Sequence, residues 1–359
     1  MNKAMKENYR IDTSKGMEIG LYTLADHVAD PKTGRRLSNQ ERINEIVEAA
    51  KFADQAGLDV FGVGESHQEY FTGQANQVIL GAIAAQTKNI KLTSAVSVLS
   101  TNDPVRVYEE YATLDLLSDG RAEIAAGRGS RTGVYDLMGY SVNDYEELFE
   151  VKMHLLKLLN EAKPGEKINW SGKFRADLRE AEIIPQPKGG HLPVWRAVGG
   201  PDESAIKAGL DGIPMMLTTL SGPSKYFYPG VKGWRLGLEK SGYDPADFPL
   251  TIAGLMGLGK DTKTAMDKMY PYLNAGWSAV RGEEFPRIVF DHSVGKEQSM
   301  MIGSPEEVID KILFQYEMYH HQRFVAEIDF GGVPLDQVKE NIELLATKVM
   351  PTVKKYTKE

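Results

Sequence analysis

Residues 90–127 read IKLTSAVSVLSTNDPVRVYEEYATLDLLSDGRAEIAAG, and this stretch decides the fold class. Residues 90–99 are almost all apolar or small, which is typical of a strand buried on both faces. Asp103 then precedes Pro104, and this pair is favoured where a helix begins. A helical pattern leads to a second apolar run at residues 121–127. Because two strands joined by a helix lie parallel in one sheet, the stretch predicts a βαβ unit.

The same alternation of a short apolar run and a longer helical pattern extends along the rest of the chain. The runs that we predict to be strands are residues 18–24, 58–63, 90–99, 121–127, 192–198, 212–219, 250–258 and 324–330. Eight strands, each followed by a helix, predict an α/β protein with a (β/α)8 TIM barrel. A doubly wound open sheet is the alternative for the same alternation.

The chain is longer than a barrel requires. It has 359 residues, whereas a typical barrel has about 250. The excess falls in three irregular stretches, near residues 163–191, 221–249 and 276–303, and the first of these has the pattern of a hairpin. We therefore expect a single barrel domain over residues 17–359 with three insertions, preceded by an N-terminal extension, residues 1–16, with little structure.

Composition restricts the chemistry and the partners. The net charge is −8, from 42 basic and 50 acidic residues, which disfavours nucleic acid as a partner. The chain has no cysteine, so any redox chemistry needs a bound cofactor. No spacing of histidines and carboxylates is typical of a metal site. Neither a membrane-spanning run of about 20 apolar residues nor a signal-peptide core is present, so we expect a cytoplasmic protein without a membrane partner.

The turn after the fifth predicted strand has the composition of an anion site. It contains Gly199, Gly200 and Pro201, and Ser204 lies in the first turn of the following helix. Glycines allow the backbone to approach a ligand closely, and the amides and dipole of a helix N-terminus attract negative charge. An ordinary strand-to-helix turn has the same composition, so this alternative stays open.

Arg128 and Gly129 follow the fourth predicted strand, which neighbours the fifth in a barrel. A guanidinium can bind a phosphate through two parallel hydrogen bonds, so Arg128 and the glycine turn can converge on one phosphate. A surface ion pair is the alternative role for Arg128. Residues 127–133 lack the glycine spacing of a dinucleotide fingerprint, which excludes a Rossmann site here.

His67 follows the second predicted strand, with Glu65 nearby. A histidine at a strand end of a barrel can act as a general acid or base, or can hydrogen-bond a cofactor ring. A polar residue without a chemical role is the alternative.

In this order, the strand-end sequences resemble the bacterial luciferase-like flavin monooxygenases, and within them a subgroup of FMN-binding oxidoreductases. The resemblance extends from Met17 to Tyr356. The motifs that carry it are Glu65-Ser66-His67, Leu99-Ser100-Thr101-Asn102-Asp103-Pro104-Val105-Arg106, Asp115-Leu116-Leu117-Ser118-Asp119-Gly120-Arg121, Gly127-Arg128-Gly129-Ser130 and Val198-Gly199-Gly200.

The resemblance implies a TIM barrel that binds FMN at its C-terminal face. It implies a homodimer formed through residues 74–86 and 105–117, and a separate flavin reductase as the source of reduced FMN. It implies an isoalloxazine support, with a non-proline cis peptide common in the family, at Ala95, Val96 and Ser97. The phosphate contacts that it implies come from Arg128 with Gly129 and from the turn that contains Gly199, Gly200, Pro201 and Ser204.

The leading hypothesis is a monooxygenase that uses reduced FMN and oxygen to oxidise a small organic substrate, with His67 acting near the flavin. A deazaflavin-dependent hydride transfer and a non-catalytic flavin-binding protein are the alternatives. One position departs from the family, which commonly has Glu-His-His after the second strand, the first histidine being catalytic in light-emitting members. Ser66 stands there in this chain, so we do not expect light emission.

Overall fold

The computed structural model describes residues 2–199 and 202–359, and its centre is a closed barrel of parallel strands. The strands pair in the order β1-β2-β3-β5-β8-β9-β10-β12, and β12 pairs with β1 to complete the ring. The short strand β4 follows β3 and pairs with β5. The prediction of an eight-stranded (β/α)8 barrel is confirmed, and the open sheet is wrong. The strands are β1 (Glu18–Thr23), β2 (Val60–Val63), β3 (Lys91–Ser94), β4 (Ser97–Val98), β5 (Ala122–Gly127), β8 (Val194–Val198), β9 (Met215–Thr218), β10 (Leu250–Leu258) and β12 (Arg323–Glu327).

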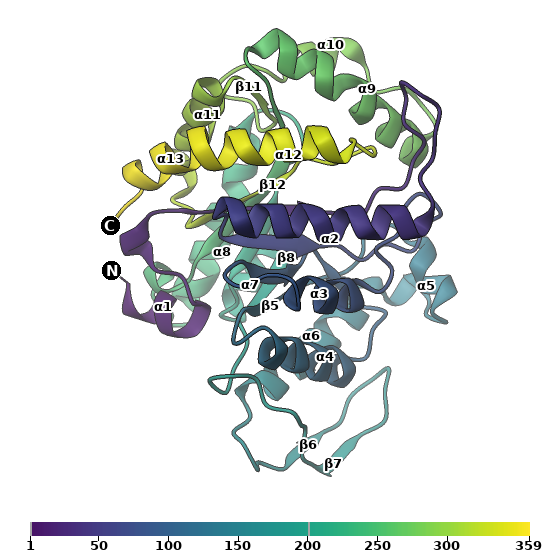
Figure 1. The fold of residues 1–359 in the computed structure, drawn as a ribbon. Coiled ribbons are helices and arrows are strands. Elements are labelled where there is room, and N and C mark those ends of the chain that lie inside the picture. The colour runs from purple at the N-terminus through teal and green to yellow at the C-terminus, as the bar shows by residue number, and fades with distance from the viewer. Residues whose placement is uncertain (1, 200–201) are drawn as a thin grey trace.

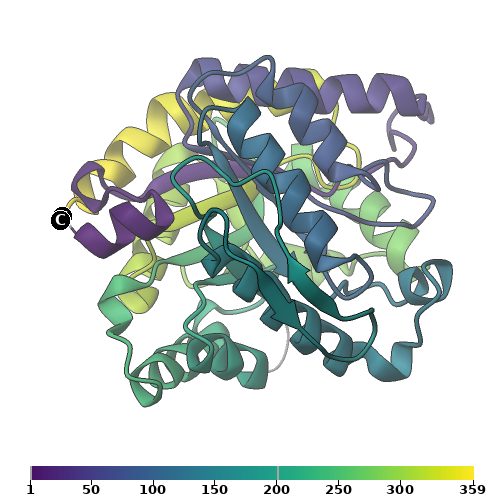
Figure 2. The ribbon, with the colours of Figure 1, turned by 90° about the horizontal axis from the view of Figure 1, so that it is seen from below.

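Helices surround the barrel, as Figures 1 and 2 show. Local sequence signals set where several of them begin. Ser38 and Glu41 form a capping box before α2, and the Asp103 carboxylate accepts hydrogen bonds from the amides of Val105 and Arg106 at the start of α4. The helices that follow the barrel strands are α2 (Asn39–Ala56), α3 (Asn76–Ala84), α4 (Pro104–Leu117), α5 (Gly133–Leu137), α6 (Tyr145–Glu161), α7 (Asp202–Leu210), α8 (Tyr228–Lys240), α9 (Thr262–Arg281) and α12 (Leu335–Leu344).

An apolar layer of the barrel interior consists of one buried side chain from each strand or the residue that follows it, and the buried Glu123 and Arg323 lie next to this layer. Strand side chains alternate between the helices outside and the centre of the barrel. The central cluster consists of Tyr22, Val60, Ala95, Ala125, Trp195, Met216, Ala253 and Val325, together with Ile11 from outside the barrel. The described part of the chain has no helix long and apolar enough to cross a bilayer.

The N-terminal extension is more ordered than the sequence indicated. It forms α1 (Lys3–Tyr9) and a 3-10 turn, η1 (Thr13–Lys15). The segment around η1 lies beside the C-terminal helix α13 (Met350–Tyr356), since the Glu359 amide donates a hydrogen bond to the Thr13 carbonyl (Figure 1). Ile11 is fully buried in the central cluster. Arg10 Nη1 lies 2.7 Å from Asp115 Oδ1 at the end of α4. We missed this structure because its contacts join residues about a hundred positions apart.

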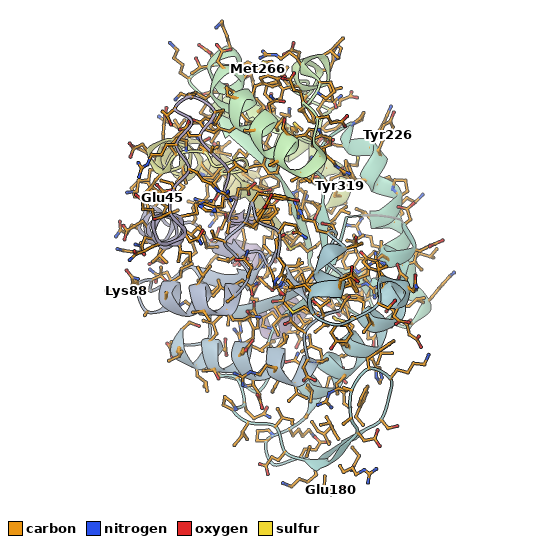
Figure 3. The ribbon with its side chains drawn as sticks, turned by 90° about the vertical axis from the view of Figure 1, so that its right-hand side faces the viewer. Glu45, Lys88, Glu180, Tyr226, Met266 and Tyr319 are labelled. Atoms are coloured by element: carbon orange, nitrogen blue, oxygen red, sulfur yellow. The ribbon has the colours of Figure 1, made fainter. Side chains whose placement is uncertain are left out.

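The three stretches expected to be insertions differ from one another. Residues 163–191 contain the predicted hairpin, β6 (Ile168–Trp170) with β7 (Leu178–Ala181), whose Glu180 projects away from the barrel in Figure 3. Residues 276–303 contain the end of α9, α10 (Arg287–His292) and β11 (Met301–Gly303), which pairs with β10 and leads into α11 (Pro305–Tyr319).

Residues 221–249 are not irregular, because they contain η3 (Ser224–Phe227), η4 (Pro245–Asp247) and between them α8, the helix that follows β9. The pattern was obscured by glycines, which weaken a helix by about 1 kcal/mol each. These glycines are needed where α8 packs against α7. A Cβ on Gly237 would lie 2.6 Å from the Ile206 carbonyl oxygen of α7, and one on Gly209 would lie 2.0 Å from that of Trp234. Glycine therefore allows α7 and α8 to pack backbone against backbone.

Candidate active site

A cavity of about 530 Å³ opens where the barrel strands end, on the face where barrel enzymes carry their active sites. This volume is within the range of small-molecule sites. The predicted site residues that line it are His67, Ala95, Val96, Arg128, Gly129 and Gly199. Ser97 and Ser204 are buried beside it without lining it. Gly200 and Pro201 lie outside the described residues.

The residues predicted to support the isoalloxazine ring, Ala95 and Val96, form the closely packed connection between β3 and β4. The peptide bond between Ala95 and Val96 is cis, as the family resemblance implied. The Val96 carbonyl accepts a 2.9 Å hydrogen bond from the Glu65 amide. Ser97 faces away from the cavity, since its hydroxyl lies 3.1 Å from the Tyr111 hydroxyl in the protein interior. The surface offered to a ring therefore comes from Ala95 and Val96.

His67 is held by the Glu65 carboxylate. The His67 Nε2 atom lies 2.8 Å from Glu65 Oε1, and both side chains are almost fully buried. Glu65 Oε2 accepts a 2.8 Å hydrogen bond from the Val98 amide, and Asn102 Nδ2 lies 3.0 Å from both carboxylate oxygens. The carboxylate thus fixes the ring with Nε2 as a donor, which leaves Nδ1 as the nitrogen able to accept a proton.

Ser66 occupies the position that differs from the family pattern. Its hydroxyl donates a 2.7 Å hydrogen bond to Gln68 Oε1, and the residue is 5 % exposed. Ser66 also lines the cavity. It cannot exchange a proton near neutral pH as a histidine does, so His67 is the histidine available at this strand end.

Arg128 is partly buried at the cavity wall and already has an acidic partner. Its guanidinium pairs with Glu146 at the start of α6 and lies 5.2 Å from the centre of the Tyr145 ring. Glu146 is more than half exposed, and its other oxygen lies 3.9 Å from Lys207 Nζ on α7. The glutamate therefore connects Arg128 to the helix whose first turn was predicted to bind phosphate.

Arg196 is a second cation near that turn, and sequence analysis missed it. It lies fully buried in β8, where Nη2 is 2.7 Å and Nη1 3.0 Å from the Glu150 carboxylate. Nη2 also donates a 3.3 Å hydrogen bond to Ser204 Oγ, while Nε has no hydrogen-bond partner among the described residues. An arginine within an otherwise apolar strand was the available signal.

The start of α7 combines favourable and unfavourable charges for an anion. Asp202 and Glu203 stand in its first turn and oppose a bound phosphate. The helix dipole, Arg128 and the buried Arg196 act in the opposite sense. The two arginines therefore supply positive charge that offsets the two acidic residues at the helix terminus.

Further polar groups line the cavity on the opposite side, where β1 and β12 end. Tyr22, Arg131 and Glu327 are the ones that sequence analysis did not select. The described residues contain no group of three or more histidines and carboxylates able to hold a metal ion. The geometry thus combines a cation-lined end, a histidine–carboxylate pair and an acidic end around one cavity.

Comparison with known proteins shows the family to which the chain is similar. Residues 17–321 match the luciferase-like monooxygenase family. The oxygenase component of a flavin-dependent trigonelline monooxygenase from Acinetobacter baylyi is 23 % identical, covering 93 % of this chain and 95 % of that protein. An F420-dependent glucose-6-phosphate dehydrogenase from Amycolatopsis mediterranei is 24 % identical, over 75 % and 78 % of the two chains.

A solved structure has the same fold. The oxygenating constituent of 3,6-diketocamphane monooxygenase from Pseudomonas putida, in complex with FMN, superposes with a TM-score of 0.75. It is 17 % identical and covers 94 % of this chain and 98 % of its own. The family match spans residues 17–321, which is most of the sequence and includes every barrel strand except β12. The chain therefore belongs to the luciferase-like monooxygenases.

Proposed function

We propose that this chain is the oxygenase component of a two-component monooxygenase, which takes reduced FMN from a separate reductase and oxidises a small organic substrate. The observation that carries the proposal is the placement of Arg128, the Ala95–Val96 step and His67 around one cavity. The relative from Acinetobacter is itself an oxygenase component that depends on flavin. The structural neighbour from Pseudomonas holds FMN.

The residues at the two ends of the cavity fit an FMN-sized cofactor with a charged tail. Arg128 and the first turn of α7, with Arg196 behind Ser204, would hold the phosphate through charge-assisted hydrogen bonds. Ala95 and Val96 would support the ring. Reduced FMN, when bound, supplies the two electrons that place one oxygen atom of O₂ in the product and the other in water.

His67 is the proposed acid–base group. Glu65 holds Nε2, so that Nδ1 accepts or returns a proton at the cavity. The cavity wall would limit the access of bulk water to the bound cofactor and substrate, which would reduce side reactions.

The proposed electron source is testable with purified protein. The protein mixed with FMN and NADH or NADPH under air should oxidise the nicotinamide only at the background rate, since no dinucleotide fingerprint is present. Added flavin reductase should start turnover, measured as substrate converted to product, because it supplies reduced FMN. Rapid nicotinamide oxidation by the protein alone would contradict the two-component assignment.

Hydride transfer with the deazaflavin F420 is the second candidate, which the Amycolatopsis relative favours. Binding assays with the two cofactors separate the proposals. We expect FMN to bind at least tenfold more tightly than F420. The reverse preference, with activity that does not require oxygen, would support the deazaflavin enzyme.

A further inference from the structure

Three carboxyl side chains gather where β1 and β12 end, and we call them the acid cluster: Asp26, Glu327 and Asp329. Each is at most 6 % exposed. Asp26 Oδ2, Glu327 Oε1 and Asp329 Oδ1 have no hydrogen-bond partner among the described residues. A buried polar atom left without a partner destabilises the protein. Other oxygens of the cluster do accept hydrogen bonds, Asp329 Oδ2 from Thr23 and Arg42 and Asp26 Oδ1 from the Gly331 amide. One oxygen of each carboxyl is therefore left without a donor.

The positive charges around the acid cluster do not balance it. Arg42 Nη2 lies 2.5 Å from Asp329 Oδ2, and Arg42 Nη1 lies 3.7 Å from Glu45 Oε2. Arg131 is the other cation, and its guanidinium lies 4.5 Å from the centre of the Phe71 ring. With Glu45, whose place on α2 Figure 3 shows, four carboxyls face two arginines. Full ionisation would leave an excess of negative charge.

Protons offset this excess while no ligand is present. Burial, with the charges of Asp26 and Asp329, raises the pKa of Glu327 well above its ordinary value. Burial and Asp329 also raise the pKa of Asp26 to about 7, and burial raises that of Glu45. The cluster therefore holds at least one proton at neutral pH.

Glu327 is the member of the cluster that reaches the cavity. It lines the wall together with the rings of Tyr22 and Phe330 and with Arg131. Burial and the neighbouring Glu327 carboxyl raise the pKa of the Tyr22 hydroxyl. Aromatic faces attract organic cations, and a buried carboxylate pairs with one. The missing positive charge, the unpartnered oxygen and the two rings thus meet at one end of the cavity.

We propose that the substrate of this enzyme carries a positively charged nitrogen, which binds at the acid-cluster end of the cavity against Glu327, Tyr22 and Phe330. The inference rests on the proposed function and names the substrate class of that same site. On binding, the ammonium group replaces one proton of the cluster, which leaves to solvent, so charge is conserved. Arg131 keeps its stacked position over Phe71, and its charge favours the ionised forms of Asp26 and Glu327.

Three ring compounds of the same size test the charge preference: benzylammonium, benzyl alcohol and benzoate. Their affinities for the FMN-loaded protein, and for the protein without added FMN, are measured by ligand-detected NMR. At pH 8 benzylammonium should bind at least tenfold more tightly than the other two. Equal affinities, or a preference for benzoate led by Arg131, would overturn the proposal.

The affinity for benzylammonium should change with pH in one direction only. Because cation binding releases a proton, the affinity for benzylammonium should rise as pH increases from 6 to 8, by up to about tenfold per pH unit. A group that binds to the protonated carboxyl would show the opposite trend. An affinity that does not change, or that falls with pH, contradicts the inference.

Glu327→Gln keeps the shape of the side chain and removes its charge. It should abolish both the preference for benzylammonium and its pH dependence, whereas Glu343→Gln, at an exposed site on α12, should change neither. If Glu327→Gln does not fold, the pH series on the wild-type protein decides. If the wild-type protein does not bind FMN, the proposed function is contradicted. If it binds FMN but does not prefer benzylammonium over benzyl alcohol and benzoate, only this inference is contradicted.

Discussion

Arg128 has two competing partners at the residue scale: the Glu146 carboxylate and the proposed cofactor phosphate. The ion pair with Glu146 is partly exposed and therefore weak, at about 0.2–1 kcal/mol. A charge-assisted hydrogen bond to phosphate contributes about 1.5–3 kcal/mol. The phosphate should therefore displace Glu146, whose exposed side chain is able to turn into solvent.

Arg128→Ala and Glu146→Gln should change FMN affinity in opposite directions. The first should raise the dissociation constant roughly 10- to 150-fold, and the second should lower it about two- to fivefold. Fluorescence titration of FMN measures both. Arg179→Ala, in the exposed β6–β7 hairpin, is the matched control and should have no effect. Unchanged affinity in Arg128→Ala would remove that residue from the site.

His67→Ala should lower turnover far more than it lowers cofactor affinity. General acid–base catalysis contributes about 10²- to 10⁴-fold to a rate, so kcat should fall within that range while the FMN dissociation constant changes less than threefold. His154→Ala replaces an exposed histidine on α6 and should retain wild-type kcat. Wild-type turnover in His67→Ala would make its pairing with Glu65 purely structural.

The N-terminal segment packs against the N-terminal ends of the barrel strands and stabilises them. Arg10 pairs with the fully buried Asp115 and donates hydrogen bonds to the carbonyls of Gly120, Ala122 and His191. Removing one partner of a buried ion pair leaves the other charge unpaired, which is costly. A single side chain thus joins the extension to α4 and β5.

Arg10→Ala should lower the free energy of unfolding by about 2–4 kcal/mol. Urea denaturation followed by circular dichroism measures it. Lys3→Ala, which removes an exposed pair with Glu7, should change stability by less than about 0.5 kcal/mol. Equal stability of the two variants would show that the extension contributes little to the fold.

The whole molecule is predicted to be a homodimer that pairs through α3 and α4. These neighbouring helices expose Val78, Leu116 and Leu117 to solvent, by 73 %, 49 % and 69 %. Burying an apolar side chain of this size contributes about 1.5–3 kcal/mol. A second copy of the chain would remove these groups from water.

Light scattering should give twice the chain mass of 39.8 kDa for the wild type. Leu117→Glu should shift the protein to a monomer, because it places a charge in the apolar contact. Leu236→Glu, at a half-exposed position on α8, should leave the dimer intact. A wild-type monomer at micromolar concentration would contradict the dimer.

The sequence by itself determined the barrel and the strand ends that face its cavity. Alternating periodicity, the Asp103-Pro104 helix start and the glycine turns act through neighbouring residues, so they can be recognised without the fold. The same local information placed His67 and Arg128 at strand ends. It missed α8, because the glycines that weaken the helix locally are needed only for its contact with α7.

Only the tertiary structure decided the charge environment of the cavity. Glu146 reaches Arg128, Arg196 supports Ser204, and Asp26 meets Glu327 and Asp329 from the other end of the chain. The acid cluster comes together because β12 closes on β1, a pairing of residues about 300 positions apart. The effect of each charge depends on burial and on its neighbours in space, and neither is written in the local sequence.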